Sequence, residues 1–101
     1  LWGDSVEGAV ARITRLVARI ERGRAAGDMA AIESARAALR DEAAALGLRR
    51  LEQVCADLAD VMERGDRPAI HAVASRIARL GPETLVLLVS IADAGLPPGA
   101  G

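Results

Sequence analysis

The stretch from Gly27 to Gly47, GDMAAIESARAALRDEAAALG, predicts a helix with a defined start and a defined end. Asp28 can accept a hydrogen bond from the free N–H groups of a first helical turn, and Gly47 suits the left-handed backbone that ends a helix. Apolar residues recur between them at three- and four-residue steps, namely Ile32, Ala35, Leu39, Ala43 and Leu46. This spacing places them on one face, so the segment reads as an amphipathic helix.

The same helical spacing occurs on both sides of this segment. One stripe of apolar residues precedes it and begins near Asp4 and Glu7, which have the spacing of a capping box. Two more stripes follow it and are separated by Gly65 and Asp66. The stripes are Val6, Val10, Ile13, Val17 and Ile20; Leu48, Leu51, Val54, Cys55, Leu58, Val61 and Met62; and Ile70, Val73, Ile77 and Leu80. Four such helices joined by short turns bury their stripes most simply side by side. We therefore predict an all-α fold, an antiparallel up-down four-helix bundle.

Gly81 and Pro82 interrupt the fourth pattern. Proline has no N–H to donate to the carbonyl of Ala78, and its ring crowds that carbonyl, so we expect the helix to kink or break there. The following residues 83–95, ETLVLLVSIADAG, are then predicted to form an additional short apolar helix. This segment either caps the bundle or pairs two copies of the chain, which leaves open a homodimer through residues 83–94.

Length and composition narrow the class of protein. The chain of 101 residues fits one domain, which we assign to residues 1–96, with residues 97–101, PPGAG, as a linker or tail. The 13 basic residues, all Arg, are nearly matched by 14 acidic ones, so we do not expect nucleic acid as a partner. We expect no metal and no cofactor, because no Cys/His cluster and no glycine-rich phosphate loop is present. The lone Cys55 and the lack of a long apolar run favour a cytoplasmic location without membrane insertion.

The outward face of the helix after Asp28 is predicted to carry a row of small side chains. Ala30, Ala37 and Ala44 are spaced by seven residues, and at about 100° per residue they fall opposite Ile32 and Leu39. The charged residues that flank this strip are Glu33, Arg40 and Asp41. We expect a flat alanine strip that faces water.

A set of residues in a common register connects this helix with a known family. Gly27 and Asp28 open the helix, Leu39, Leu46 and Gly47 continue it, and Leu51, Cys55, Leu58 and the ERGD of residues 63–66 follow. Over about residues 10–80 the chain resembles the histidine-containing phosphotransfer domains of bacterial two-component signalling. In that family a GD opens a helix, a His follows nine residues after the Asp, and the helix continues as HxLKGxxxxLG. The resemblance implies a four-helix bundle that docks a response-regulator receiver domain or a histidine kinase.

The chain departs from that family where the chemistry should be. Ala37 occupies the place of the phosphoacceptor histidine, Arg40 replaces the lysine, and Asp41 replaces a glycine that lets a receiver come close. A methyl group cannot carry a phosphoryl group. The resemblance therefore implies a degenerate domain that is not an enzyme and serves as a non-catalytic interaction module. Its expected partner-binding residues are Ala30, Glu33, Ala37, Arg40, Asp41 and Ala44.

Two alternatives remain open. His71, the single histidine, follows Asp66 by five residues instead of nine, and an unconventional phosphotransfer protein would have to use it. We expect it at the edge of the core, partly exposed. The second alternative is a structural bundle that serves dimerisation or links parts of a larger chain.

Overall fold

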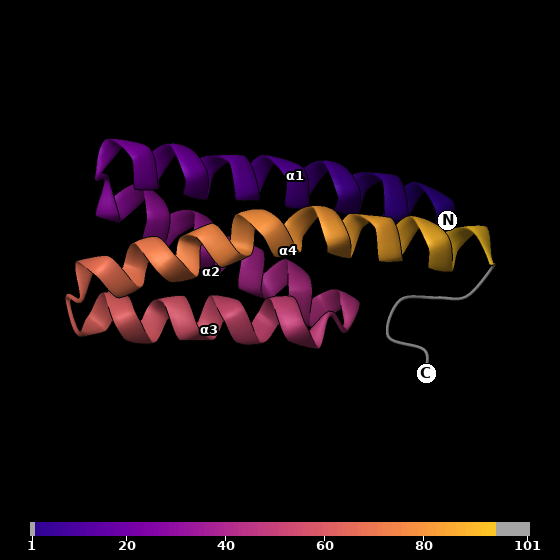
Figure 1. Cartoon of the computed structure of the whole chain (residues 1–101). Helices are drawn as coiled ribbons and strands as arrows, with labels where there is room; N and C mark the ends of the chain where they lie inside the picture. The colour runs from indigo at the N-terminus through magenta and orange to yellow at the C-terminus, as the bar shows by residue number, and fades with distance from the viewer. Residues whose placement is uncertain (1, 95–101) are drawn as a thin grey trace.

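The computed structural model describes residues 2–94, with side chains from Val6 onward, and these residues form four α-helices (Figure 1). The helices are α1 (Trp2–Ala26), α2 (Met29–Leu46), α3 (Arg49–Glu63) and α4 (Arg67–Asp93). No strand occurs between residues 2 and 94, so the all-α prediction is confirmed. The boundary at residue 96 and the linker at residues 97–101 lie outside the described residues.

Three glycines and two aspartates define the turns between the helices. Gly27, Gly47 and Gly65 have φ values of 68°, 71° and 67°, a left-handed backbone that glycine adopts without steric cost. The carboxylates of Asp28 and Asp66 accept hydrogen bonds from first-turn N–H groups of α2 and α4, at 3.0 and 3.1 Å. The start of α1 and the end of α4 lie at the same end of the molecule (Figure 1).

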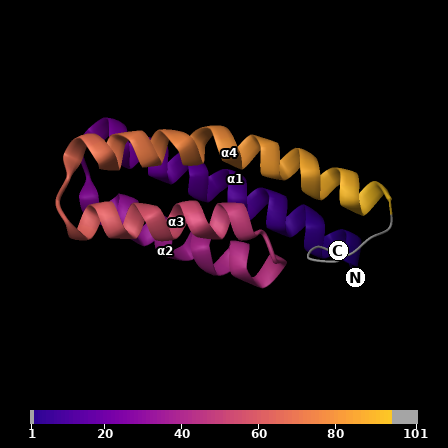
Figure 2. The same cartoon turned by 60° about the horizontal axis from the view of Figure 1, so that its bottom comes forward.

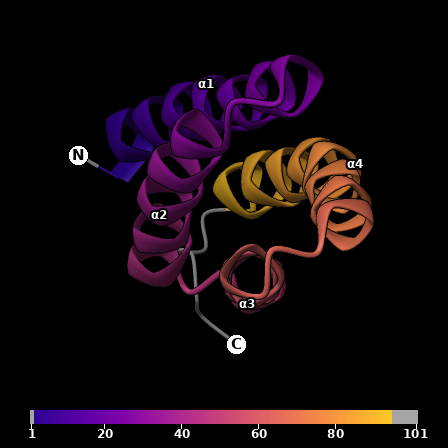
Figure 3. The same ribbon diagram turned by 90° about the vertical axis from the view of Figure 1, so that its left-hand side faces the viewer.

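Each helix packs against two neighbours around a common core. The view along the helices shows the order α1, α2, α3, α4 around the centre (Figure 3), and the contacts agree: α1 packs against α2 and α4, and α3 packs against the same two helices. The largest side chains that are almost completely buried are Ile13, Ile20, Ile32, Leu39, Leu51, Cys55, Leu58, Ile77 and Leu88. All but Leu88 belong to the stripes predicted from the sequence.

The buried face of α1 differs from the prediction at its edges. Val6, Ile13 and Ile20 are buried as expected, but Ala9 and Leu16 are buried where Val10 and Val17 were predicted. Both sets have helical spacing, because residues at i+3 and i+4 fall on either side of the same stripe. Ala9 is fully buried and Leu16 is 8% exposed, so the core lies toward this edge of the stripe.

The prediction of a separate short helix after Gly81 and Pro82 is wrong. The fourth helix continues from Arg67 through Gly81 and Pro82 to Asp93 without a break. Proline costs the helix one hydrogen bond, a loss of about 3 kcal/mol in a helix interior. Burial on both sides of this point offsets that loss, since Ile77 and Gly81 are followed by the buried Thr84 and Leu88. The Thr84 hydroxyl donates a hydrogen bond to the Leu80 carbonyl at 2.9 Å and is thereby satisfied within the helix.

The apolar segment of α4 is consequently only half covered. The N-terminal part of α1 and the C-terminal part of α4 extend beyond the turn that joins α2 to α3 (Figure 2). Leu88 is fully buried there, but Val86, Leu87 and Val89 are 68%, 52% and 47% exposed. Part of the segment therefore contributes to the core, and the rest leaves an exposed apolar surface. Among the described helices, none combines the length and the apolar character that crossing a membrane requires.

Gly81 lets α4 approach α1 closely. A Cβ atom at this position would lie 2.9 Å from Cγ2 of Val17, with Cγ1 at 3.5 Å and Cβ at 3.7 Å. Valine in a helix strongly prefers one χ1 rotamer, so turning its methyl groups away from this point is unfavourable. Close packing therefore requires glycine at position 81, although glycine has a poor helix propensity.

We predict that Gly81→Ala lowers the free energy of unfolding by about 1 kcal/mol. Alanine gains about 1 kcal/mol of helix propensity over glycine, but overpacking a tight contact costs about 1–3 kcal/mol. In a Val17→Ala background the clash is absent, and the same Gly81→Ala change should stabilise the protein by about 1 kcal/mol. Chemical denaturation of the four proteins in this cycle measures both effects. A Gly81→Ala variant equally stabilising in both backgrounds would contradict the close contact.

Candidate docking surface on α2

The six predicted partner-binding residues lie on one side of α2, opposite its buried face. Ala30, Glu33, Arg40, Asp41 and Ala44 are exposed. The sixth, Ala37, is half-buried, so the strip is less open than expected at its centre. Its methyl group lies among the longer side chains of Glu33, Arg40 and Asp41, three or four residues away on the same helix face. The arrangement gives a shallow surface with charged side chains around a small central residue.

Arg36 is a residue of this region that the sequence analysis missed. Its Nε and one terminal nitrogen donate hydrogen bonds to the two carboxylate oxygens of Glu33, both at 2.7 Å. Arg36 itself is only 9% exposed, whereas the Glu33 side chain is 50% exposed. The signal was available in the sequence, because opposite charges three residues apart on a helix lie within reach of each other.

This ion pair changes the electrostatics of the α2 surface. The hydrogen bonds from Arg36 lower the pKa of Glu33, and the carboxylate in turn raises the pKa of Arg36. Glu33 thus stays negatively charged, but the guanidinium of Arg36 already neutralises that charge. Arg40 has no carboxylate within 4.0 Å among the described residues, and Asp41 is exposed. The surface therefore presents one neutralised pair, one available guanidinium and one available carboxylate.

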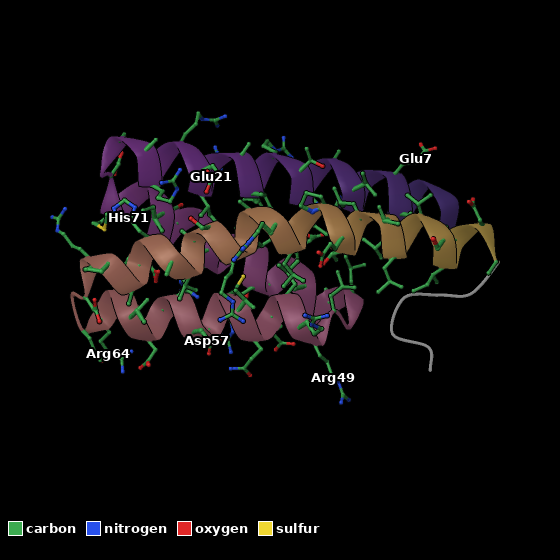
Figure 4. All side chains as sticks on the ribbon, in the orientation of Figure 1. Glu7, Glu21, Arg49, Asp57, Arg64 and His71 are labelled. Carbon is green, nitrogen blue, oxygen red and sulfur yellow. The ribbon has the colours of Figure 1, made fainter. Side chains whose placement is uncertain are left out.

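Two arginines lie together beside the strip. A depression of about 330 Å³ between α2 and α3 is lined by Arg40 and Arg49, with Glu52 as its acidic residue. Arg49 lies at the start of α3 (Figure 4). The α2 strip is therefore basic on its α3 side.

Cys55 lies behind the strip in the core. The thiol is fully buried, and desolvation raises its pKa to about 11, although the positive charges of Arg36 and Arg40 act in the opposite direction. Because the thiolate is the reactive form, a thiol with this pKa is a poor nucleophile at neutral pH. Cys55 contributes to packing and adds no chemistry to the surface.

The single histidine does not join this surface. His71 is exposed near the N-terminal end of α4 (Figure 4), and α4 packs against α1 and α3 but not against α2. The structure therefore does not bring His71 together with Ala37. In the part of the chain that the structure describes, no three His, Cys, Asp or Glu residues gather as metal ligands would.

Comparison with known proteins gives no relative. No protein-family model, no curated protein and no solved structure matches the chain. The likeness to phosphotransfer domains therefore depends on the residue spacing from Gly27 to Asp66.

We predict that the Glu33–Arg36 pair makes a pH-dependent contribution to the free energy of unfolding. Because the folded-state pKa of Glu33 is lowered, its contribution is present above the ordinary glutamate pKa of about 4.3 and is lost as the pH falls through the lowered value. Glu33→Gln should therefore reduce the free energy of unfolding by about 1 kcal/mol at pH 7, a value discounted for the exposure of Glu33. The difference from the wild type should vanish in acid. Urea denaturation as a function of pH measures it.

Glu63→Gln is the matched control. Glu63 is exposed and forms no ion pair within the described residues, so its substitution should change stability by less than about 0.5 kcal/mol at any pH. A pH-independent loss in Glu33→Gln would show that helix packing, and not the charge on Glu33, is responsible.

Proposed function

We propose that this chain is a degenerate phosphotransfer-like domain that docks a receiver domain or a histidine kinase without carrying phosphate. The observation that supports it is the outward α2 surface, on which the place of the relay histidine holds Ala37. The fold supports it at a coarser level, since four helices joined by short turns surround one core. We interpret their arrangement as the antiparallel up-down bundle that the resemblance implies.

Docking and phosphate transfer have different requirements. Transfer needs a nucleophilic side chain in line with an aspartyl phosphate, and neither an alanine nor an arginine can serve as that covalent carrier. Docking needs only shape and charge. On the receiver side the resemblance implies a cluster of carboxylates around a metal, to which the guanidinium of Arg40 is complementary.

Asp41 opposes such a partner unless its charge is offset. Arg40 is the adjacent residue, and the charge of Asp41 is close enough to Arg36 to contribute to the raised pKa of that guanidinium. The positive charges of Arg36 and Arg40 therefore offset the negative charge of Asp41 on the same helix. We propose that it selects partners by this mixed charge pattern and binds them without reaction.

Restoring the family residues tests this function. We predict that Ala37→His combined with Asp41→Gly accepts phosphate from a phosphorylated receiver domain, because the docking geometry is retained and only the nucleophile is missing. Acid-labile phosphate on the protein, measured by mass spectrometry and by radiolabel transfer, is the readout. The wild type should remain unlabelled.

Ala72→His is the matched control, since Ala72 is an exposed alanine on α4 and a histidine there should not be labelled. Helical circular dichroism must show that each variant is folded. A folded double variant without phosphate, together with receiver-induced NMR shifts confined to α1 and α4, would reject the α2 surface.

The exposed apolar residues of α4 favour a second candidate function, a structural bundle that pairs two copies through residues 83–94. Val86 and Val89 are exposed without belonging to the core. We predict a dimer under this alternative, and Val86→Gln with Val89→Gln should convert it to a monomer, because both side chains would lose apolar burial. Sedimentation equilibrium decides the point: a wild type that is monomeric at high concentration eliminates the pairing.

A further inference from the structure

Two neighbouring depressions on the α3–α4 side of the molecule together make up a groove. The first, of about 410 Å³, lies between α3 and α4, and the second, of about 280 Å³, lies at the turn between α2 and α3. Arg50, Leu80 and Glu83 line both, so the two depressions lie side by side. None of the six residues of the α2 surface lines either depression.

The α4 wall of the groove is a single helical stripe. Arg76, Arg79, Leu80, Glu83 and Leu87 follow one another at three- and four-residue steps, the spacing of one helix face. Its basic residues come first and its exposed leucine comes last. The stripe therefore changes from charged to apolar toward the C-terminal end of α4.

The charged part of the groove holds positive charge without partners. Arg50, Arg76 and Arg79 have no carboxylate within 4.0 Å among the described residues. Of the two acidic residues, Asp57 accepts a hydrogen bond from the Gln53 side-chain amide at 3.0 Å. Three arginines against Asp57 and Glu83 give the first depression a net charge of +1, in a chain whose formal net charge is -1. The groove thus offers guanidinium donors to an acidic ligand.

The other end of the groove is apolar. Its floor contains Leu48 and Leu51, which are 8% and 1% exposed, and its rim contains Leu87, which is 52% exposed. Leu80 is half-buried between the two parts. An apolar side chain placed here would remove Leu87 from water.

We propose that this groove binds an acidic amphipathic helix of another protein. Apolar residues of that helix would pack against Leu80 and Leu87, and its carboxylates would face Arg50, Arg76 and Arg79. The groove calls for both features, because a simple anion would make no use of the leucines and a purely apolar segment would leave the three guanidinium groups unpaired. Helices commonly bind grooves in this way, through anchors three, four and seven residues apart.

A second copy of this chain fits the groove less well. Two of the three exposed apolar residues of α4, Val86 and Val89, do not line it. Self-pairing through them would also leave the arginines of the groove without acidic partners. The charge of the groove therefore favours a foreign acidic ligand.

A fluorescein-labelled synthetic peptide tests the proposal. The probe is a helical peptide with leucines at helical spacing on one face and glutamates on the others, and fluorescence anisotropy follows its binding to the intact chain. Arg76→Glu with Arg79→Glu should weaken binding about tenfold or more, because like charges then face each other. Leu87→Ser should weaken it about tenfold through lost apolar burial. Raising the salt concentration should weaken the wild-type interaction as well.

The chain offers a matched control for the charge reversal. Arg19 and Arg22 are also exposed arginines three residues apart, but they lie on α1, and Arg19→Glu with Arg22→Glu should leave binding unchanged. All substituted residues are exposed, and helical circular dichroism confirms that each variant is folded. NMR shifts should map to α3 and to α4 between residues 76 and 87.

Four outcomes would overturn the proposal. Equal binding of a peptide whose leucines are replaced by serine would indicate a simple anion site. Equal binding of a peptide whose glutamates are replaced by glutamine would indicate a purely apolar groove. A wild-type dimer that Leu87→Ser dissociates would assign the groove to a second copy, and equal weakening by the α1 control would indicate nonspecific charge attraction. None of these outcomes depends on the α2 surface, so the two functions succeed or fail separately.

Discussion

The close approach of α1 to both of its neighbours is the constraint on which the rest of the structure depends. On the α2 side, a Cβ atom at Gly23 would lie 2.8 Å from Cγ1 of Ile32, and on the α4 side a Cβ at Gly81 would lie 2.9 Å from Cγ2 of Val17. Protein interiors are packed as densely as crystals, so glycine backbone this close to a neighbouring side chain leaves little freedom in the rotation of each helix. The two glycines thereby fix which faces of α2 and α4 remain outside.

The sequence predicted the parts of this fold that local rules determine. Asp28 and Gly47 cap α2 as expected, and the stripe of Ile32, Leu39 and Ala43 is buried. The turns at Gly27 and Gly65 likewise follow from the need for a positive φ. These features were predictable because each depends on residues only a few positions apart.

The errors have tertiary causes. Pro82 does not end α4, because burial of Thr84 and Leu88 beyond it outweighs the lost hydrogen bond. Ala9 is buried and Val10 only half-buried, because the spacing alone does not determine how α1 is rotated against its neighbours. The half-burial of Ala37 depends on where its neighbouring side chains lie, and the α3–α4 groove depends on residues 30 positions apart in the sequence, such as Arg50 and Leu80.

The two proposed surfaces differ in how their charges are held, and this difference has a functional consequence. On α2 the guanidinium of Arg36 is already bound to Glu33. A partner that binds there loses little free energy in desolvating this guanidinium, but it also gains little electrostatic energy from its charge. In the α3–α4 groove three guanidinium groups have no such carboxylate, so an acidic ligand gains new charge-assisted hydrogen bonds. The α2 surface is therefore suited to shape-dependent docking with modest electrostatic gain, while the groove is suited to a ligand recognised by charge. Arg49 lines the depressions on both sides of α3, so two partners bound at once would come closest to each other at the start of that helix.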